Sequence, residues 1–256
     1  MKDSMAGLFD LTGKVALVTG ASRGLGAAMA IALAEAGADV AIHASEKPPT
    51  NTEDAITERG RKARCFTADL SKREQTARLV PSVISAFGRL DILVNNAGIC
   101  KRKPAADHPD EIWDETIEIN LSSVFRLSRA AGVHMLERGG GKIVNVASLL
   151  SFQGGITVPS YAAAKGGVAQ LTKALANEWA CKNINVNAIA PGYMRTDNTS
   201  ALQVDPVRSR QIGERIPAGR WGDPEDLCGA VVFLSARASD YVHGHLLVVD
   251  GGWMGR

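Results

Sequence analysis

Residues 14–30, KVALVTGASRGLGAAMA, hold the stretch that decides the fold. A short apolar run, VALV at 15–18, leads through a glycine-rich turn into a helical pattern that runs from Gly24 to Ala36 and ends at Gly37. This pattern is almost entirely Ala, Gly, Leu, Ile and Met, as in a helix that packs closely against a sheet. A strand, a tight turn and a buried helix in this order form the first half of a βαβ unit.

The turn itself, TGASRGLG at 19–26, places Gly20, Gly24 and Gly26 between the strand and its helix. Glycines here let the backbone turn tightly and approach a pyrophosphate, while the helix N-terminus offers free N–H groups and a positive dipole end. Tight packing without a ligand is the alternative, but the position directly after the first strand favours a dinucleotide site. The GxxxxGK[ST] signature of a P-loop is absent.

Six further apolar runs follow, separated by segments of helical length. They are DVAIHA (39–44), ARCFTA (63–68), DILVNN (91–96), KIVNVA (142–147), INVNAIA (184–190) and HLLVVD (245–250). The alternation predicts an α/β protein with a Rossmann-like, doubly wound fold, in which a seven-stranded parallel sheet is flanked by helices. Since no linker divides the chain, we expect residues 1–256 to form a single dinucleotide-binding catalytic domain, with a substrate lid at about 192–220.

The end of the second strand discriminates between NAD and NADP. An acidic residue there typically holds the ribose hydroxyls of NAD, but this chain has Ala44 and Ser45, and Glu46 comes only after them. Arg23, in the glycine turn, has the fork of donors that suits a 2′-phosphate. The sequence predicts NAD(P) as the cofactor and favours NADP over NAD, while Glu46 leaves an NAD arrangement open.

Composition excludes several classes of protein. The net charge of +2 comes from interspersed charges, so the footprint of a nucleic-acid-binding protein is missing. The apolar runs are far shorter than the roughly 20 residues of a membrane helix, and no signal peptide begins the chain, so we expect a cytoplasmic protein without a membrane partner. The four cysteines form no CxxC pair, and no HExxH spacing occurs, so neither a disulfide framework nor a metal is expected.

A possible proton donor lies in the stretch SFQGGITVPSYAAAKGG, residues 151–167. Tyr161 and Lys165 are four residues apart and therefore share one face of a helix, while Ser148 ends the fifth strand at the edge where ligands of such sheets bind. An ammonium about 4 Å from the phenol is worth about 4 kcal/mol, or roughly three pKa units. Lys165 is thus expected to bring the pKa of Tyr161 to near 7. On its own the pair is also typical of a half-buried ring beside a solvated charge.

The motifs together resemble those of the short-chain dehydrogenase/reductase family. The glycine turn, NNAG at 95–98, Asn120, Ser148, the Tyr161/Lys165 pair and PG at 191–192 occur in the order of that family, over nearly the whole chain. The resemblance implies that Tyr161 is the general acid/base and that Lys165 lowers its pKa and holds the nicotinamide ribose. It also implies that Ser148 donates a hydrogen bond to the reacting oxygen and that Asn120 anchors a water linking Lys165 to solvent.

The same resemblance implies the cofactor contacts. Asp69 is expected to meet the adenine and Thr196 the carboxamide of the nicotinamide. The full set of expected contacts is Gly20, Ser22, Arg23, Gly24, Leu25, Gly26, Ser45, Asp69, Leu70, Asn96, Ala97, Gly98, Tyr161, Lys165, Pro191, Gly192, Met194 and Thr196.

A narrower resemblance concerns the substrate. SFQGGITVPSY (151–161) and the C-terminal stretches resemble those of 2-deoxy-D-gluconate 3-dehydrogenases, also described as 2-dehydro-3-deoxy-D-gluconate 5-dehydrogenases, which act on keto-deoxy sugar acids in carbohydrate metabolism. A carboxylate with several hydroxyls requires an Arg or Lys together with amide and hydroxyl partners. The expected substrate contacts are Arg102, Ser148, Gln153, Tyr161, Tyr193 and Asn198.

Two other functions stay open from the sequence. The glycine turn and the segment HASEK (43–47) resemble those of NADP-using 3-oxoacyl carrier-protein reductases, so a ketoreductase of that kind is the first alternative. A non-catalytic dinucleotide sensor is the second, because a fold alone does not prove a function. The resemblance also implies a homotetramer, in which the C-terminal strand takes part in pairing the subunits.

Overall fold

A computed structural model describes residues 4–46 and 50–256 of the chain. Its centre is one seven-stranded sheet in the order β3-β2-β1-β4-β5-β6-β7, with every pair of neighbours parallel. The strands are β1 (Val15–Val18), β2 (Asp39–Ala44), β3 (Ala63–Thr67), β4 (Ile92–Asn95), β5 (Gly141–Val146), β6 (Ile184–Pro191) and β7 (Leu246–Val249). Each of the seven apolar runs matches one strand to within one residue at either end, which confirms the predicted fold class.

The central strands are buried on both faces. Every residue of β1, β4 and β6 is buried, as expected of a parallel sheet covered on two sides. The strand order reverses between β1 and β4, which pair through Ala16 with Ile92 and Val18 with Val94. At such a reversal the loops after the two strands diverge and leave a crevice at their carboxyl ends. The glycine turn and NNAG, which follow β1 and β4, lie on the two sides of this crevice.

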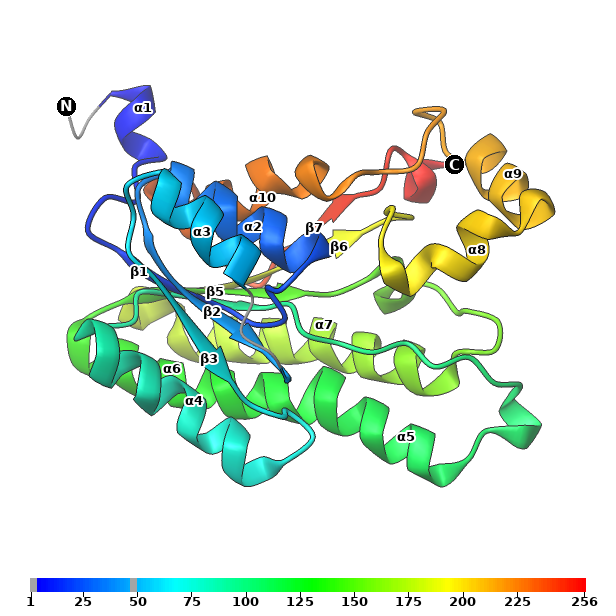
Figure 1. Ribbon diagram of the computed structural model, residues 1–256, viewed down its shortest axis with the longest axis horizontal. Helices are drawn as coiled ribbons and strands as arrows, with labels where there is room; N and C mark the ends of the chain where they lie inside the picture. The colour runs from blue at the N-terminus through cyan, green and yellow to red at the C-terminus, as the bar shows by residue number, and fades with distance from the viewer. Residues whose placement is uncertain (1–3, 47–49) are drawn as a thin grey trace.

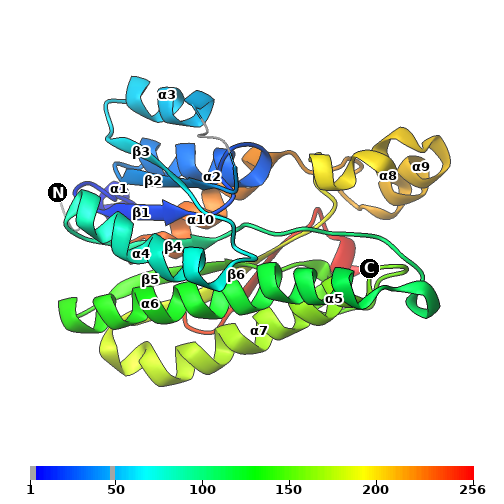
Figure 2. The ribbon, with the colours of Figure 1, turned by 60° about the horizontal axis from the view of Figure 1, so that its bottom comes forward.

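Helices cover both faces of the sheet (Figures 1 and 2). One face carries α2 (Gly24–Glu35), α3 (Thr50–Glu58) and α10 (Cys228–Ser235); the other carries α4 (Arg73–Phe87), α5 (Asp110–Ile117), α6 (Ser123–Arg138) and α7 (Pro159–Trp179). A short α1 (Met5–Leu8) precedes the sheet. The helix α2 ends as the sequence predicts, just before Gly37. Gly37 has φ +107°, and a Cβ there would lie 2.7 Å from Thr12 Oγ1.

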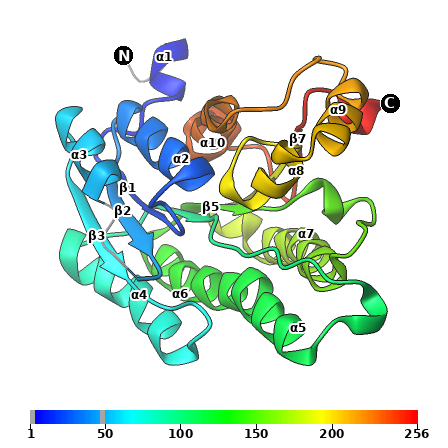
Figure 3. The same cartoon turned by 45° about the vertical axis from the view of Figure 1, so that its right-hand side comes forward.

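The segment after β6 differs from the irregular loop that the sequence suggested. It contains α8 (Ser200–Val204) and α9 (Pro206–Arg215), which stand beside the carboxyl edge of the sheet near the C-terminus (Figure 3). Asp205 begins α9 by accepting hydrogen bonds from the N–H groups of Val207 and Arg208, and Pro206 occupies the first helical position. The proposed lid at 192–220 is therefore largely helical.

The described residues hold no disulfide, no cluster of metal-binding side chains and no helix that could span a membrane. All four cysteines are free thiols. Within residues 4–46 and 50–256, no group of three or more His, Cys, Asp or Glu side chains is placed to hold a metal ion. None of the helices in those residues combines the length and the apolar character that a membrane crossing requires.

Candidate active site

A cavity of about 460 Å³ lies at the carboxyl ends of the central strands. It extends from the glycine turn, past the ends of β2 and β3, to the catalytic candidates on α7. Its lining includes sixteen of the predicted site residues: Gly20, Ser22, Arg23, Gly24, Leu25, Gly26, Ser45, Asp69, Leu70, Asn96, Ala97, Gly98, Tyr161, Lys165, Thr196 and Asn198. Residues far apart in the sequence thus meet at one edge of the sheet, where ligands of doubly wound folds bind.

The glycine turn is packed too tightly for other residues. A Cβ on Gly26 would lie 2.2 Å from the carbonyl oxygen of Gly20, and Gly20 itself has φ +63°. Asn96 clamps the turn from the other side, because its Nδ2 donates to the carbonyl oxygens of Thr19 and Gly20 at 2.8 and 3.1 Å. The close approach leaves the N-terminus of α2 open to the cavity, and this arrangement fits the pyrophosphate of a dinucleotide.

His43 is a part of this site that the sequence reasoning passed over as the end of a strand. Its Nδ1 accepts the N–H of Gly20 at 3.2 Å, and its Nε2 lies 2.8 Å from the carbonyl oxygen of Ala68. The ring is 1% exposed, and burial lowers its pKa, so the imidazole is neutral and donates through Nε2. His43 therefore braces the glycine turn against the end of β3. A polar residue in the otherwise apolar run DVAIHA was the available signal.

Asn120 holds the loop that follows β4. It lies in a π-helical turn, η2 (Glu118–Ser122), and is fully buried. Its Oδ1 accepts the N–H of Ile99 at 2.9 Å and its Nδ2 donates to the oxygen of Ile99 at 2.8 Å. Gly98 leaves room for this contact, since a Cβ there would lie 3.2 Å from Asn120 Oδ1. The side-chain amide of Asn120 thus uses both its oxygen and its nitrogen to hydrogen-bond the backbone of Ile99.

Ser148 and Tyr161 lie within hydrogen-bonding reach of each other. Ser148 comes directly after β5 and begins a short helix, η3 (Leu149–Ser151), where its Oγ also accepts the N–H of Leu150. Ser151, which the sequence reasoning missed, ties this turn to α7: its Oγ accepts the N–H of Ser148 and donates to the oxygen of Lys165 at 2.7 Å. The position of Ser148 relative to α7 is therefore fixed by a neighbouring hydroxyl.

The protonation of Tyr161 differs from the expectation. Burial, followed by the nearby Cys100, raises the pKa of Tyr161 to about 12, and the groups that lower it are Ser148 and Arg102. Lys165 is not among the groups that lower the pKa of Tyr161; its Nζ donates to the oxygen of Val146 at 2.6 Å and lies 5.6 Å from the centre of the tyrosine ring. Burial lowers the pKa of Lys165 to about 8. The expected pKa near 7 for Tyr161 is thus wrong for this arrangement, in which the phenol is protonated at neutral pH.

The predicted substrate contacts are only partly brought together. Asn198 lines the cavity, and the charge of Arg102 reaches the phenol of Tyr161. Gln153 is half-buried in the turn after η3. Tyr193 instead packs against Trp221 and Trp253, with ring centres 5.5 and 4.7 Å apart. It lines a second pocket of about 160 Å³.

Three predicted cofactor contacts also lie outside the large cavity. Gly192 and Met194 line the smaller pocket, and Pro191 ends β6 without lining either. Met194 is buried, and its sulfur fills the space that a Cβ on Gly222 would need. The roles of these three residues toward a cofactor stay predictions.

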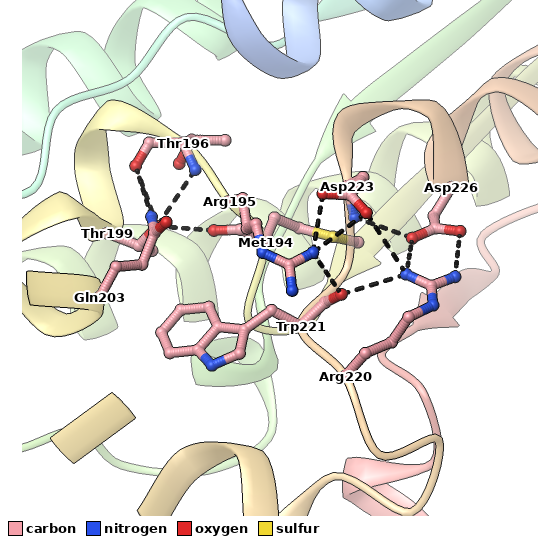
Figure 4. Close-up of polar contacts among 9 residues, drawn as sticks. All are labelled: Met194, Arg195, Thr196, Thr199, Gln203, Arg220, Trp221, Asp223 and Asp226. Atoms are coloured by element: carbon pink, nitrogen blue, oxygen red, sulfur yellow. Dashed lines mark hydrogen bonds and ion pairs between the residues drawn. The ribbon is translucent and has the colours of Figure 1, made fainter. Parts of the chain in front are cut away.

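Two networks of ion pairs organise the segment after β6 (Figure 4). Arg195 bonds Asp223 at 2.9 Å, and Arg220 bonds Asp226 through both guanidinium nitrogens at 2.6 and 2.7 Å. Both arginines also donate to the oxygen of Trp221, which links the two ion pairs at the base of the proposed lid.

A separate ion pair crosses the mouth of the cavity. Arg23 of the glycine turn bonds Asp197 at 2.7 Å, and both side chains are about three-quarters exposed. Asp197 and Arg195 line the cavity, and neither was predicted from the sequence. Their short, polar surroundings in GYMRTDNTS (192–200) gave no more specific signal than a loop. The other lining residues that were missed are His43, Ala44, Ile99, Ile119 and Val146.

The fold and this cavity define a class of protein: a doubly wound dinucleotide-binding domain with Ser, Tyr and Lys gathered where the nicotinamide end of a cofactor belongs. A family model described as enoyl-(acyl carrier protein) reductase matches residues 20–254. The chain belongs to this family, which is part of the short-chain dehydrogenases/reductases, and the predicted family is thereby confirmed.

Individual relatives narrow the comparison. The chain is 53% identical to 2-dehydro-3-deoxy-D-gluconate 5-dehydrogenase of Escherichia coli (strain K12), over 97% of this chain and 98% of the relative. A structure from Agrobacterium tumefaciens with bound NADP, provisionally named a 2-deoxy-D-gluconate 3-dehydrogenase, is 52% identical, with a TM-score of 0.92 over 97% of this chain and 99% of that one. The predicted closer resemblance to this group is thus confirmed.

A more distant structure shows that similarity of the fold alone does not identify the substrate. A 3-oxoacyl (acyl-carrier-protein) reductase from Agrobacterium tumefaciens C58, with NADP bound, has a TM-score of 0.93 over 98% of both chains but is only 28% identical. The two TM-scores are nearly equal, so the course of the backbone does not separate the two substrate classes. The sequence identities differ more, at 52% and 28%.

Proposed function

We propose that this protein is an NAD(P)-dependent oxidoreductase that transfers a hydride between a nicotinamide and a keto-deoxy sugar acid of the 2-deoxygluconate or 2-dehydro-3-deoxygluconate type. The observation that carries this proposal is that Tyr161 and Lys165 line the same cavity as the glycine turn. A proton donor and a dinucleotide cradle thus open onto one space. The identity of 53% to a sugar-acid dehydrogenase supports the substrate class.

In the direction of reduction, Tyr161 donates its proton to the carbonyl oxygen as the carbonyl carbon receives the hydride. A pKa of about 12 keeps the phenol protonated at neutral pH and ready for this step. Ser148, hydrogen-bonded to Tyr161, is placed to donate to the same oxygen. A bound nicotinamide supplies or accepts the hydride, and its oxidised form adds a positive charge that favours the phenolate. Lys165, with a pKa of about 8, lies one helical turn away and would hold the ribose.

We favour NADP over NAD. Among the described residues that line the cavity, those at the end of β2 are His43, Ala44 and Ser45, and none of them carries a carboxylate to repel a 2′-phosphate. Glu46 is exposed and is not part of the lining. Arg23, which also lines the cavity, has a guanidinium that suits a 2′-phosphate.

Arg102 is the proposed partner of the substrate carboxylate. Its charge lowers the pKa of both Tyr161 and Cys100, which supports a position near the phenol. A carboxylate bound there places a carbonyl a few atoms away within reach of the phenol. Asn198, on the lid side of the cavity, is placed to meet a hydroxyl.

The experiment that tests the proposal is an initial-rate survey. 2-Deoxygluconate, 2-dehydro-3-deoxygluconate, its 4,5-diketo relative and acetoacetyl thioester are each offered with NAD(H) and NADP(H). Turnover confined to sugar acids, with the lower KM for NADP(H), is the expected result. Turnover of the thioester alone would replace the proposal by the 3-oxoacyl reductase, which the 28% identity disfavours.

Tyr161→Phe separates an enzyme from a dinucleotide sensor. The variant keeps the ring and its packing but removes the proton donor, so turnover should fall by about a hundred- to ten-thousandfold. The dissociation constant for the cofactor, measured by fluorescence titration, should change by less than about twofold, since the phenol contributes little binding energy. A wild-type protein that binds nucleotide but turns over no carbonyl compound would favour the sensor.

A homotetramer is also proposed, with a cytoplasmic location. The outer face of α6 supports association, because Phe125, Val133 and Leu136 are 40–54% exposed there. The strand β7 supports a second contact, since it is half-buried at one edge of the sheet. The four free thiols agree with a reducing compartment.

A further inference from the structure

The loop between β4 and α5, residues 99–109, brings Cys100 and Arg102 to the phenol of Tyr161. This loop has no regular structure except for one short turn, so its position depends on contacts with its surroundings. The first contact is at its start, where the buried amide of Asn120 bonds both the N–H and the oxygen of Ile99. The rest of the loop is almost entirely exposed. Lys101, next to Arg102, pairs with Glu115 of α5, and two further contacts at the far end of the loop help to set where the guanidinium lies.

The second contact is made through a strained residue. The N–H of Lys103 donates to the oxygen of Thr157 at 2.8 Å. Thr157 has φ +64°, a left-handed conformation that β-branched residues rarely adopt and that costs of order 1–3 kcal/mol. This residue precedes the catalytic tyrosine by only four positions. Strain of this kind persists where surrounding contacts impose it, and it is concentrated at functional sites.

The third contact joins the loop to the catalytic helix itself. Nε2 of His108 lies 3.0 Å from Oγ of Ser160, which is 0% exposed and is the second residue of α7, adjacent to Tyr161. Nδ1 of His108 is buried and has no hydrogen-bond partner among the residues that the structure describes. A buried, unpaired nitrogen costs about 1–3 kcal/mol. The imidazole of His108 is therefore held by the contact between Nε2 and Ser160, while its Nδ1 makes no hydrogen bond with the described residues.

We propose that His108 is a positioning residue for the reaction. Through Ser160 it holds the first turn of α7 against the loop that carries Arg102, and so sets the distance between the phenol of Tyr161 and the guanidinium that binds the substrate. The inference rests on the proposed roles of Tyr161 and Arg102. The side chain acts through Ser160 and is not itself a catalytic residue.

The electrostatic surroundings of the phenol provide a readout of this arrangement. Cys100 and Arg102 face Tyr161 from the loop, Ser148 faces it from the turn after β5, and Lys165 lies on its own helix. Arg102 lowers the pKa of the phenol. Burial and Cys100, which lies on the same loop, raise it more strongly. If the loop moves away, these larger contributions weaken together with that of Arg102, so the pKa of Tyr161 falls.

The test compares His108→Ala with His108→Gln, whose amide can still bond Ser160. For His108→Ala we expect kcat with the sugar acid to fall by about tenfold, since small displacements of reacting groups cost this much. In the oxidation direction, which needs the phenolate, the rise of kcat/KM should move to lower pH, because the pKa of Tyr161 falls. The dissociation constant for NADP, measured by titration without substrate, should stay within about twofold, because His108 does not line the cofactor cavity. His108→Gln should recover most of the rate and the original pH profile.

Two further variants separate positioning from simple stability. Ser160→Ala should reproduce the loss, and the double variant should lose little more, because both residues belong to one contact. His134→Ala is the matched control, since His134 also bonds a loop, accepting the N–H of Leu90 at 3.2 Å just before β4, at the end of the sheet opposite the cavity. It should lower the melting temperature by a few degrees, as His108→Ala does, and leave kcat unchanged.

Two results would overturn the inference. The first is a kcat within about twofold of the wild type in His108→Ala, with an unchanged pH profile. The second is a loss that follows the fraction of folded protein and is as large in His108→Gln as in His108→Ala. If instead the wild-type enzyme turns over no sugar acid, the proposed function fails, and the failure is visible before any His108 variant is examined.

Discussion

Lys165 is a charged side chain that is only 4% exposed. Its Nζ donates a hydrogen bond to the backbone oxygen of Val146, and burial lowers its pKa to about 8. Tyr161, one turn earlier, is shifted the other way, to about 12. Both shifts favour the neutral form, because burial penalises charge on either group. The pair is therefore held at a cost in stability, which is common at sites where function requires a buried titratable group.

This cost predicts a pH-dependent stability. Between pH 8 and 10.5 the folded protein has lost the Lys165 proton while the unfolded chain, with the ordinary lysine value of 10.5, keeps it. The unfolded state binds more protons in this window, so the free energy of unfolding should rise with pH, by up to about 3 kcal/mol. This gain is complete above pH 10.5 and is lost as the pH falls to 8.

Lys165→Met isolates this contribution, because methionine fills a similar volume without a charge. Urea unfolding from pH 7.5 to 10 should show a smaller rise in the variant than in the wild type, although other groups add the same background to both. Turnover should be lost. Equal slopes for the two proteins would mean that Lys165 titrates normally in the fold.

Sequence reasoning found some of these residues and missed others for a physical reason. Ser148, Tyr161 and Lys165 were found because their residue types and spacing carry the chemistry directly. His43, Ser151 and His108 were missed because their partners lie 14 to 52 positions away in the chain. The pKa of Tyr161 was misjudged for a related reason: helical spacing places Lys165 nearby, but does not show that its Nζ turns to Val146.

At the scale of elements, the strands were predictable and the lid was not. A parallel sheet buried on both faces requires continuous apolar runs, and all seven runs were visible. The helices α8 and α9 are short, and α9 buries only Ile212, so they leave a weak apolar pattern. Their best signal was the pair Asp205 and Pro206, which begins α9.

The lid is linked to the cofactor site by the pair of Arg23 and Asp197, and this contact predicts a competition. Arg23 is also the proposed ligand of the 2′-phosphate, so a cofactor that carries this phosphate must compete with Asp197 for one guanidinium. Exposed ion pairs are worth about 0–1 kcal/mol. Asp197→Asn should therefore tighten the binding of NADP by no more than about fivefold and leave NAD unchanged.

The matched variant is Arg23→Ala, which should weaken NADP and 2′,5′-ADP but not NAD or 5′-ADP. Dissociation constants from calorimetry check all four ligands without any turnover. Equal effects of Asp197→Asn on NAD and NADP would show that the aspartate acts on the lid alone. Loss of NAD binding in Arg23→Ala would place the arginine at the pyrophosphate instead.

At the scale of the whole molecule, α6 presents three large apolar side chains to the surface. Phe125, Val133 and Leu136 occupy positions 0, 8 and 11 along α6 and so share one face of that helix. A hollow of about 360 Å³ adjoins this face, lined by Phe125, Arg129 and residues from neighbouring segments, including Leu171 of α7. Arg129 lies over the ring of Phe125 at 5.2 Å. Apolar side chains around a hollow with arginines at its edge are typical of a protein interface.

We therefore expect Val133→Glu to reduce the size of the assembly in solution. Val133 is 54% exposed, so a glutamate causes no damage in the monomer, whereas burying its charge in an interface is costly. Val207→Glu is the control, because Val207 is 62% exposed on α9, away from this face. Light scattering coupled to gel filtration should give a tetramer for the wild type and for Val207→Glu, and dimers or monomers for Val133→Glu. A wild-type monomer, or an unchanged mass for Val133→Glu, would leave α6 as an ordinary surface.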